Sequence, residues 1–197
     1  DFLESSFAQV IENDVTLIAK KRDHIEWLTE DRKIWKNANN TNAQFAWYKS
    51  KSGFKLGNAF DDLNDSTDEI LSLLEDPKRN GNWMTRGMVV GDVQSGKTSH
   101  YTGLITKAID SGYKLIIVFS GIYNALRAQT QQRIEENTIK TSQQGEVLNK
   151  VFFATAKPDY IYKDGIRVIQ AENDFSAASA KQISMTNLDP TILVVKK

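Results

Sequence analysis

The chain has 197 residues, enough for one large domain or two small ones around a substantial core. Its 25 basic residues balance 25 acidic ones, so no overall charge draws it to nucleic acid or to a membrane surface. Because there are no cysteines, the composition excludes a disulfide-stapled secreted scaffold, a thiolate metal site and a cysteine nucleophile. The longest unbroken apolar run, 115–119, is far too short to cross a membrane. These features predict a soluble, cytoplasmic protein.

The two ends of the sequence predict a piece of a longer protein. The chain begins at Asp1 without a methionine and lacks the basic and apolar regions of a signal peptide. It closes on residues 191–197, an apolar stretch typical of a buried strand. A parallel strand normally leads into a crossover helix, and none follows here.

Residues 1–80 are predicted to form a helical N-terminal region with an acidic balance, 11 basic against 15 acidic residues. Apolar residues recur at helical spacing over 2–36, interrupted near Asn13, whereas the polar stretch 37–57 is predicted to be loop. Residues 66–69 open a short helix that runs through Leu74. This region is a candidate surface for a protein partner.

Four aromatic residues of this region could stack on nucleic-acid bases, but their character favours a role in the core. They are Trp27, Trp35, Trp47 and Tyr48. The turn-rich stretch 76–82 is the predicted boundary with a second domain, 81–197.

Residues 81–197 alternate between strand and helix patterns, which predicts an α/β domain with a mostly parallel sheet. The predicted elements are, in order, strand 86–90, helix 97–111 ended by Gly112, strand 114–120, helix 124–136, strand 151–155 and strand 191–195. Residues 160–163 and 166–169 flank Asp164-Gly165, which indicates a hairpin.

One stretch, Gly91-Asp-Val-Gln-Ser-Gly-Lys-Thr98, fits the phosphate-binding pattern G-x-x-x-x-G-K-[ST] without deviation. Glycines let the backbone wrap closely, so that its amides point at phosphate oxygens, and the following helix adds its positive end. Lys97 would contact the β- and γ-phosphates of ATP, and the Thr98 hydroxyl would hold Mg²⁺. The predicted nucleotide-binding residues are Gly91, Asp92, Val93, Gln94, Ser95, Gly96, Lys97, Thr98 and Ser99. The alternative is a glycine-rich turn that binds nothing.

A second polar constellation follows the strand 114–120. Small residues end that strand, and polar side chains lie along the next helix, where they could hold a nucleic-acid backbone. The candidate DNA contacts are Ser120, Gly121, Asn124, Arg127, Gln129 and Thr130. A solvated helix start explains the same residues equally well.

The sequence over 86–98, 112–118 and 120–133 resembles the Z-one domain family, the helicase-like phosphate-loop regions of bacterial proteins classed as endonucleases. Members occur beside restriction–modification and MORC-type ATPase genes, so the resemblance implies a DNA-acting protein of bacterial defence. It covers about 83–197, and residues 190–197 look like a later strand of the family. It implies a phosphate-loop NTPase fold like that of superfamily II helicases, with Gly91–Thr98 as the ATP loop. Residues 120–130 are then similar in position to a strand-contacting motif.

One feature of that family is missing, the apolar strand that ends in consecutive acidic residues and helps to hold Mg²⁺. None of the predicted strands ends in this way, and no carboxylate cluster fits a nuclease centre. We therefore expect these 197 residues to bind ATP and to hydrolyse it poorly or not at all.

Two functions remain open from the sequence. The first is the ATP-binding part of an ATP-dependent, helicase-like endonuclease. The second is a nucleotide-gated module in which ATP binding organises a surface for a protein partner, without motor activity. DNA stimulation of ATP hydrolysis by the whole protein would distinguish the two.

Overall fold

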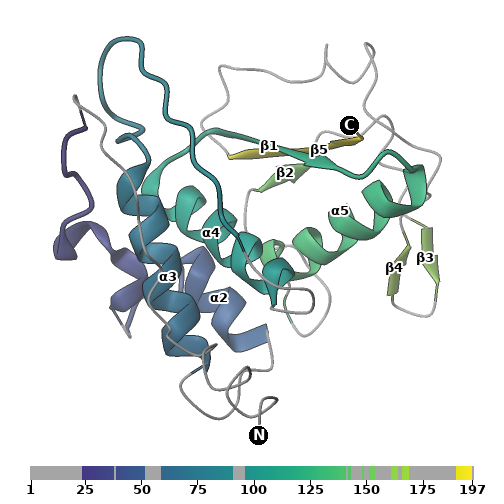
Figure 1. Cartoon of the computed structure of the whole chain (residues 1–197). Coiled ribbons are helices and arrows are strands. Elements are labelled where there is room, and N and C mark those ends of the chain that lie inside the picture. The colour runs from purple at the N-terminus through teal and green to yellow at the C-terminus, as the bar shows by residue number, and fades with distance from the viewer. Residues whose placement is uncertain are drawn as a thin grey trace, which may run out of the picture.

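The computed structural model describes residues 24–37, 39–51, 59–90, 96–140, 142, 148, 151–153, 161–163, 166–168 and 190–196. Within them, four α-helices and two short 3-10 helices pack beside a small parallel sheet (Figure 1). The helices are η1 (Glu30–Arg32), η2 (Ile34–Lys36), α2 (Gln44–Lys51), α3 (Ala59–Leu73), α4 (Lys97–Ser111) and α5 (Asn124–Thr138). The strands are β1 (Leu115–Ser120), β2 (Phe152–Phe153), β3 (Ile161–Lys163), β4 (Ile166–Val168) and β5 (Thr191–Lys196).

The parallel sheet has the strand order β1-β5-β2. β1 pairs with β5 along its whole length, from Leu115 opposite Thr191 to Ser120 opposite Lys196, and β2 pairs with the start of β5 on the other side. Strands β3 and β4 form a separate antiparallel pair, as the hairpin pattern predicts. The expected α/β architecture is therefore present.

The strand expected at 86–90 is not formed. Residues 82–90 belong to no helix or strand, and the side chains of Met88 and Val90 are 86% and 82% exposed. Figure 1 draws this segment as a loop that precedes α4. A strand requires a partner for its backbone amides and carbonyls, and no described strand pairs with these residues.

The N-terminal region also differs from its prediction. Within 24–36 the chain makes two short 3-10 turns in place of a continuous helix, and residues 1–23 of the predicted helical stretch lie outside the described part. The stretch expected to be loop contains α2. The short helix expected from Ser66 is the second half of α3, which begins at Ala59.

Helix α2 begins where a distant carboxylate caps it. Asp110 Oδ1 accepts the N–H of Gln44 at 2.7 Å, and Asp110 Oδ2 accepts the N–H of Phe45 at 3.0 Å. Lys140 Nζ donates to the carbonyls just before the helix, including that of Ala43 at 3.2 Å. Free amides at a helix start are satisfied in this way by side chains, here by the Asp110 carboxylate of α4, whereas Lys140, two residues after α5, binds the carbonyls that precede the helix.

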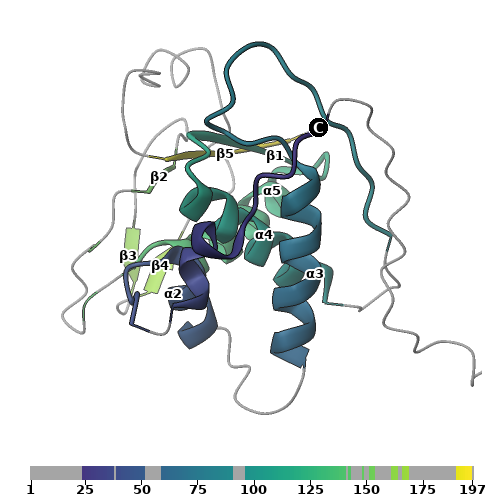
Figure 2. The ribbon, with the colours of Figure 1, turned by 90° about the vertical axis from the view of Figure 1, so that its left-hand side faces the viewer.

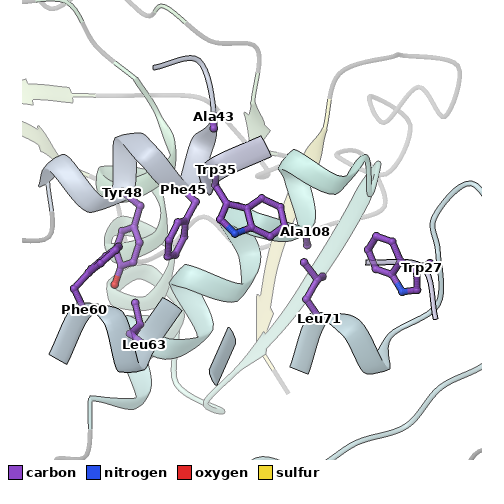
Figure 3. Packing of buried hydrophobic residues seen from close by; sticks show 9 residues of the cluster. All are labelled: Trp27, Trp35, Ala43, Phe45, Tyr48, Phe60, Leu63, Leu71 and Ala108. Atoms are coloured by element: carbon purple, nitrogen blue, oxygen red, sulfur yellow. The ribbon is translucent and has the colours of Figure 1, made fainter. Parts of the chain in front are cut away.

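A first apolar core joins α2, α3 and α4 (Figure 3). Its buried members are Trp27, Trp35, Ala43, Phe45, Tyr48, Phe60, Leu63, Leu71 and Ala108. The prediction that Trp27, Trp35 and Tyr48 serve the core is confirmed, whereas Trp47 is only partly buried. Members from both sides of the predicted boundary at 80/81 share this core.

A second apolar core lies between the sheet and the helices α4 and α5. Its buried members are Ile105, Ile109, Ile134, Ile192 and Val194, with Ile116 and Val118 of β1 partly buried against them. Both helices lie on the same side of the sheet (Figures 1 and 2). The strand at Leu115–Ser120 is therefore covered on the face of Ile116 and Val118, and its other face is open, since Phe119 is 70% exposed.

Candidate functional site

The phosphate-loop motif ends at the start of α4. Gly96 adopts a left-handed conformation with φ of 73°, which glycine reaches without strain, and the helix begins at the next residue, Lys97. The N–H of His100 donates to the Gly96 carbonyl at 3.0 Å, the first turn of the helix. Helix 97–111 and its end at Gly112, with φ of 103°, agree with the prediction. Gly91, Asp92, Val93, Gln94 and Ser95 lie outside the described residues.

The described end of the motif has the features that bind an anion. Lys97 is exposed, and Thr98 and Ser99 are half-buried on the first turn of α4. The first amides of a helix lack partners within it, and the helix dipole places partial positive charge at this end. An exposed ammonium beside these amides suits a phosphate group.

Two contacts from the N-terminal region reach the same turn. The hydroxyl of Tyr48 on α2 donates to the carbonyl of Ser99 at 3.0 Å. Ser66 Oγ on α3 lies 3.1 Å from His100 Nε2, within hydrogen-bond distance. Burial raises the pKa of Tyr48, so its hydroxyl stays protonated as a donor, and burial with nearby Lys107 lowers the pKa of His100. The start of α4 is thus tied to both α2 and α3.

These anchoring residues were not predicted from the sequence. Tyr48 was recognised only as a core aromatic, and Ser66 only as a helix start. Each contact joins residues more than 30 positions apart in the sequence, so no local sequence pattern predicts it. The apolar residues just before Tyr48 in the sequence, at 45–47, indicate that it is buried but do not name α4 as its partner.

The donor set for Mg²⁺ at this place is small. The Thr98 hydroxyl could supply one oxygen, which fits a magnesium ion that takes its other ligands from phosphates and water. Among the described residues, no group of three or more histidines or carboxylates is arranged to hold a metal ion. The described part of the chain therefore offers Thr98 for Mg²⁺ and no acidic partner for it.

The second predicted site lies on and after β1. Ser120 ends that strand, and its hydroxyl donates to the carbonyl of Val195 at 3.1 Å. Gly121 and Gln129 are exposed, and Asn124 is half-buried at the first position of α5. Thr130 donates to the carbonyl of Leu126, one turn back in the same helix. Exposed positions here leave a surface that a nucleic-acid backbone could approach.

Arg127 does not belong to that surface. Its side chain is 1% exposed, and Nη1 donates to Gln131 Oε1 at 2.6 Å, while Gln131 Nε2 donates to Glu135 Oε1 at 2.8 Å. These three residues, spaced four apart, form a buried polar ladder along α5. Sequence spacing alone could not show which face of α5 is covered, because this helix has polar residues all round.

Comparisons with known protein families, with curated proteins and with solved structures gave no match. The resemblance to the Z-one domain family thus rests on the motifs quoted above. None of the helices in the described ranges combines the length and apolar character needed to cross a membrane.

Proposed function

We propose that this chain binds ATP with Mg²⁺ through residues 91–98, as part of a DNA-acting, ATP-dependent protein of the helicase-like endonuclease class. One observation supports this most directly. The complete phosphate-loop sequence ends with Gly96 in a left-handed conformation and with a helix that begins at Lys97. Backbone amides, the helix dipole and the Lys97 ammonium then converge on one anion. Thr98 supplies the hydroxyl oxygen to Mg²⁺.

The test is calorimetric titration of Mg-ATP into the unmodified chain and into Lys97→Ala. Loss of a charged hydrogen bond to phosphate costs about 2–3 kcal/mol, so affinity should fall roughly 30- to 150-fold. Lys78→Ala is the matched control, because Lys78 is also exposed but lies in the 76–82 stretch outside the motif. Equal ATP affinity in all three proteins, or no binding in any, would contradict the proposal.

DNA contact is the weaker part of the proposal and now excludes Arg127. The remaining candidates are Ser120, Gly121, Asn124, Gln129 and Thr130. We expect alanine at exposed Gln129 to weaken DNA binding by the whole protein, and alanine at buried Gln131 to act only through stability. Fluorescence anisotropy with a labelled oligonucleotide, at one fixed salt concentration, measures both.

A second candidate function, the nucleotide-gated interaction module, is favoured by the contacts at the start of α4. Tyr48 and Ser66 connect the phosphate-loop end of α4 to α2 and α3, so a ligand there acts on helices of the N-terminal region. ATP hydrolysis that rises with DNA supports the motor function. Partner capture that needs ATP and ignores DNA supports the module.

A further inference from the structure

The ammonium group of Lys140 lies against three consecutive backbone carbonyls. Its Nζ donates to the carbonyl of Ala43 at 3.2 Å, to that of Thr41 at 3.4 Å and also to that of Asn42. A lysine ammonium has three N–H donors and no acceptor, so three convergent carbonyl oxygens match its donors one for one. The three carbonyls thus meet at a single position, which holds a positive charge.

The lysine side of this contact is fixed by the end of α5. The N–H of Ile139 donates to the Glu135 carbonyl at 2.8 Å, and the Lys140 carbonyl accepts the N–H of Leu148 at 2.8 Å. Ile139 also packs against the second apolar core. The backbone that carries Lys140 is therefore held in place by contacts that do not involve residues 41–43.

The carbonyl side is organised by hydrogen bonds in which Lys140 takes no part. The N–H of Ala43 donates to the Asn40 carbonyl at 3.2 Å, and the N–H of Asn40 donates to the Asn37 carbonyl at 2.9 Å. The Ala43 carbonyl also accepts the N–H of Trp47 at 3.2 Å, in the first turn of α2. Because these bonds hold the backbone before α2, we expect the three carbonyls to keep their arrangement when the ammonium is removed.

The charges around this position favour a monovalent cation. Burial lowers the pKa of Lys140, and the nearby Asp110 carboxylate opposes that shift, so a negative charge lies close to the ammonium. Its three hydrogen-bond acceptors, however, are neutral carbonyls. A divalent cation takes about six or more oxygen ligands, usually with carboxylates among them. Three neutral oxygens with three matched N–H donors suit a primary ammonium ion instead.

The position is open to small ions from one side. Thr41 and Asn42 are both exposed, whereas the Lys140 side chain that fills the position is buried, with 8% exposure. Beyond its Cβ, a lysine side chain has the atoms of n-propylammonium. That ion therefore matches the space that Lys140→Ala leaves, and it can reach the carbonyls from the side of Thr41 and Asn42.

We propose that the carbonyls of residues 41–43 form a preformed site for a primary ammonium ion, which Lys140 occupies in the native chain and a free alkylammonium ion occupies when that side chain is removed. The occupied site joins the segment after α5 to the segment before α2. It is independent of nucleotide binding, since none of its residues belongs to the phosphate-loop motif.

The test is thermal unfolding of the unmodified chain and of Lys140→Ala, each with and without n-propylammonium chloride. Loss of the buried ammonium should lower the unfolding midpoint by roughly 3–10 °C. Propylammonium should raise the midpoint of Lys140→Ala with increasing concentration, as a ligand of the folded state does. The change in the unmodified chain, where the site is filled, is subtracted. Potassium and tetramethylammonium chlorides carry the same charge without N–H donors and should not restore stability.

Two variants serve as matched controls. Lys140→Met fills most of the space of the lysine stem without an ammonium, and Lys78→Ala removes an exposed lysine elsewhere. Neither should gain stability from propylammonium. An equal gain in either control, or an equal gain of Lys140→Ala from potassium or tetramethylammonium, overturns the proposal, because the effect then does not depend on N–H donors at this site. Absence of any gain in Lys140→Ala also overturns it.

A measurement on the unmodified chain decides the case in which Lys140→Ala does not fold. An ammonium held by three carbonyls exchanges its protons slowly with water, so nuclear magnetic resonance of isotopically labelled lysine should detect it. We expect its protons to show nuclear Overhauser contacts to the α-protons of Asn42 and Ala43, whereas the exposed Lys78 ammonium exchanges too fast to show any. Absence of contacts from every lysine ammonium to residues 41–43 overturns the proposal.

Discussion

Lys107 and Asp110 lie one turn apart on α4, and each holds a different neighbour in place. Lys107 is fully buried and donates to Asn64 Oδ1 at 2.9 Å and to Asp68 on α3. Its ammonium also lies 4.3 Å from the centroid of the Phe45 ring. Asp110 caps α2. Polar residues of one helix thus fix the positions of the two helices that contact the phosphate-loop end of α4.

The stability contribution of Asp110 should depend on pH. Burial raises its pKa to about 6, above the usual 3.8, against the opposing effect of the Gln44 and Phe45 amides. Between these two pKa values, the folded chain keeps a proton that the unfolded chain releases. The contribution of Asp110 to the free energy of unfolding is therefore largest below about pH 4 and is lost as pH rises through 6. Asparagine, which cannot ionise, lacks this dependence.

We expect the stability of the unmodified chain relative to Asp110→Asn to fall by up to about 3 kcal/mol between about pH 4 and 7. Urea unfolding of both proteins across this range measures it, and the difference removes the effects of all other groups. A difference that stays constant, or that grows with pH, would show that Asp110 does not titrate as described.

Removing Lys107 should be more damaging than removing an exposed lysine. Loss of one partner of a buried ion pair costs about 3–5 kcal/mol. The loss of stability in Lys107→Met should lie at the low end of this range, because Lys33 Nζ still lies 3.4 Å from Asp68 Oδ2 and partly neutralises that carboxylate. Lys78→Met is the exposed control and should change stability by less than about 0.5 kcal/mol. Chemical denaturation gives both values, and equal effects would refute the structural role of Lys107.

At the scale of elements, Gly103 lies where α4 packs against side chains of α2 and α3. A Cβ at this position would lie 3.4 Å from both Leu63 and Phe45 and 3.5 Å from Tyr48, which is ordinary contact distance. Alanine thus fits, whereas a larger side chain would overlap atoms of α2 and α3. The position tolerates one methyl group and no more.

Gly103→Ala should therefore raise the free energy of unfolding, by about 0.5–1 kcal/mol, because alanine favours a helix interior over glycine. Gly103→Leu should lower it by about 1–3 kcal/mol through overpacking. Thermal unfolding followed by circular dichroism ranks the three proteins. If leucine is tolerated as well as alanine, the three helices are not packed as closely as described.

Elements set by local patterns were predictable, and those set by distant partners were not. Helix 97–111 follows from its periodicity and from Gly112, and β5 follows from an unbroken apolar run. Helix α2 was missed because its cap, Asp110, stands 66 residues from Gln44. Likewise the motif 91–98 could be recognised from sequence, whereas the contact of Tyr48 with Ser99 depends on packing.

At the scale of the whole molecule, the N-terminal helices and α4 form one packed unit. The apolar core of α2 and α3 includes Ala108 of α4, and Lys107 Nζ of α4 donates to Asn64 Oδ1 of α3 at 2.9 Å. Two independent domains would have separate cores. A core shared across the predicted boundary at 80/81 implies that the residues on its two sides lose their structure together.

Unfolding should therefore be a single cooperative transition in the described region. Three of the four tryptophans, at 27, 35 and 47, lie before the boundary, so their emission reports on the N-terminal region. Circular dichroism at 222 nm, a wavelength that reports helix in general, follows α4 and α5 together with α2 and α3. We expect the midpoints and slopes of the two urea curves to coincide, as two-state behaviour requires.

Trp83→Phe is the control, because it removes the one tryptophan beyond the boundary and should leave the emission midpoint unchanged. Emission that changes at lower urea than the circular dichroism would instead show that the N-terminal helices detach first, and the coupling of Tyr48 and Ser66 to the start of α4 would then be too weak to transmit nucleotide binding.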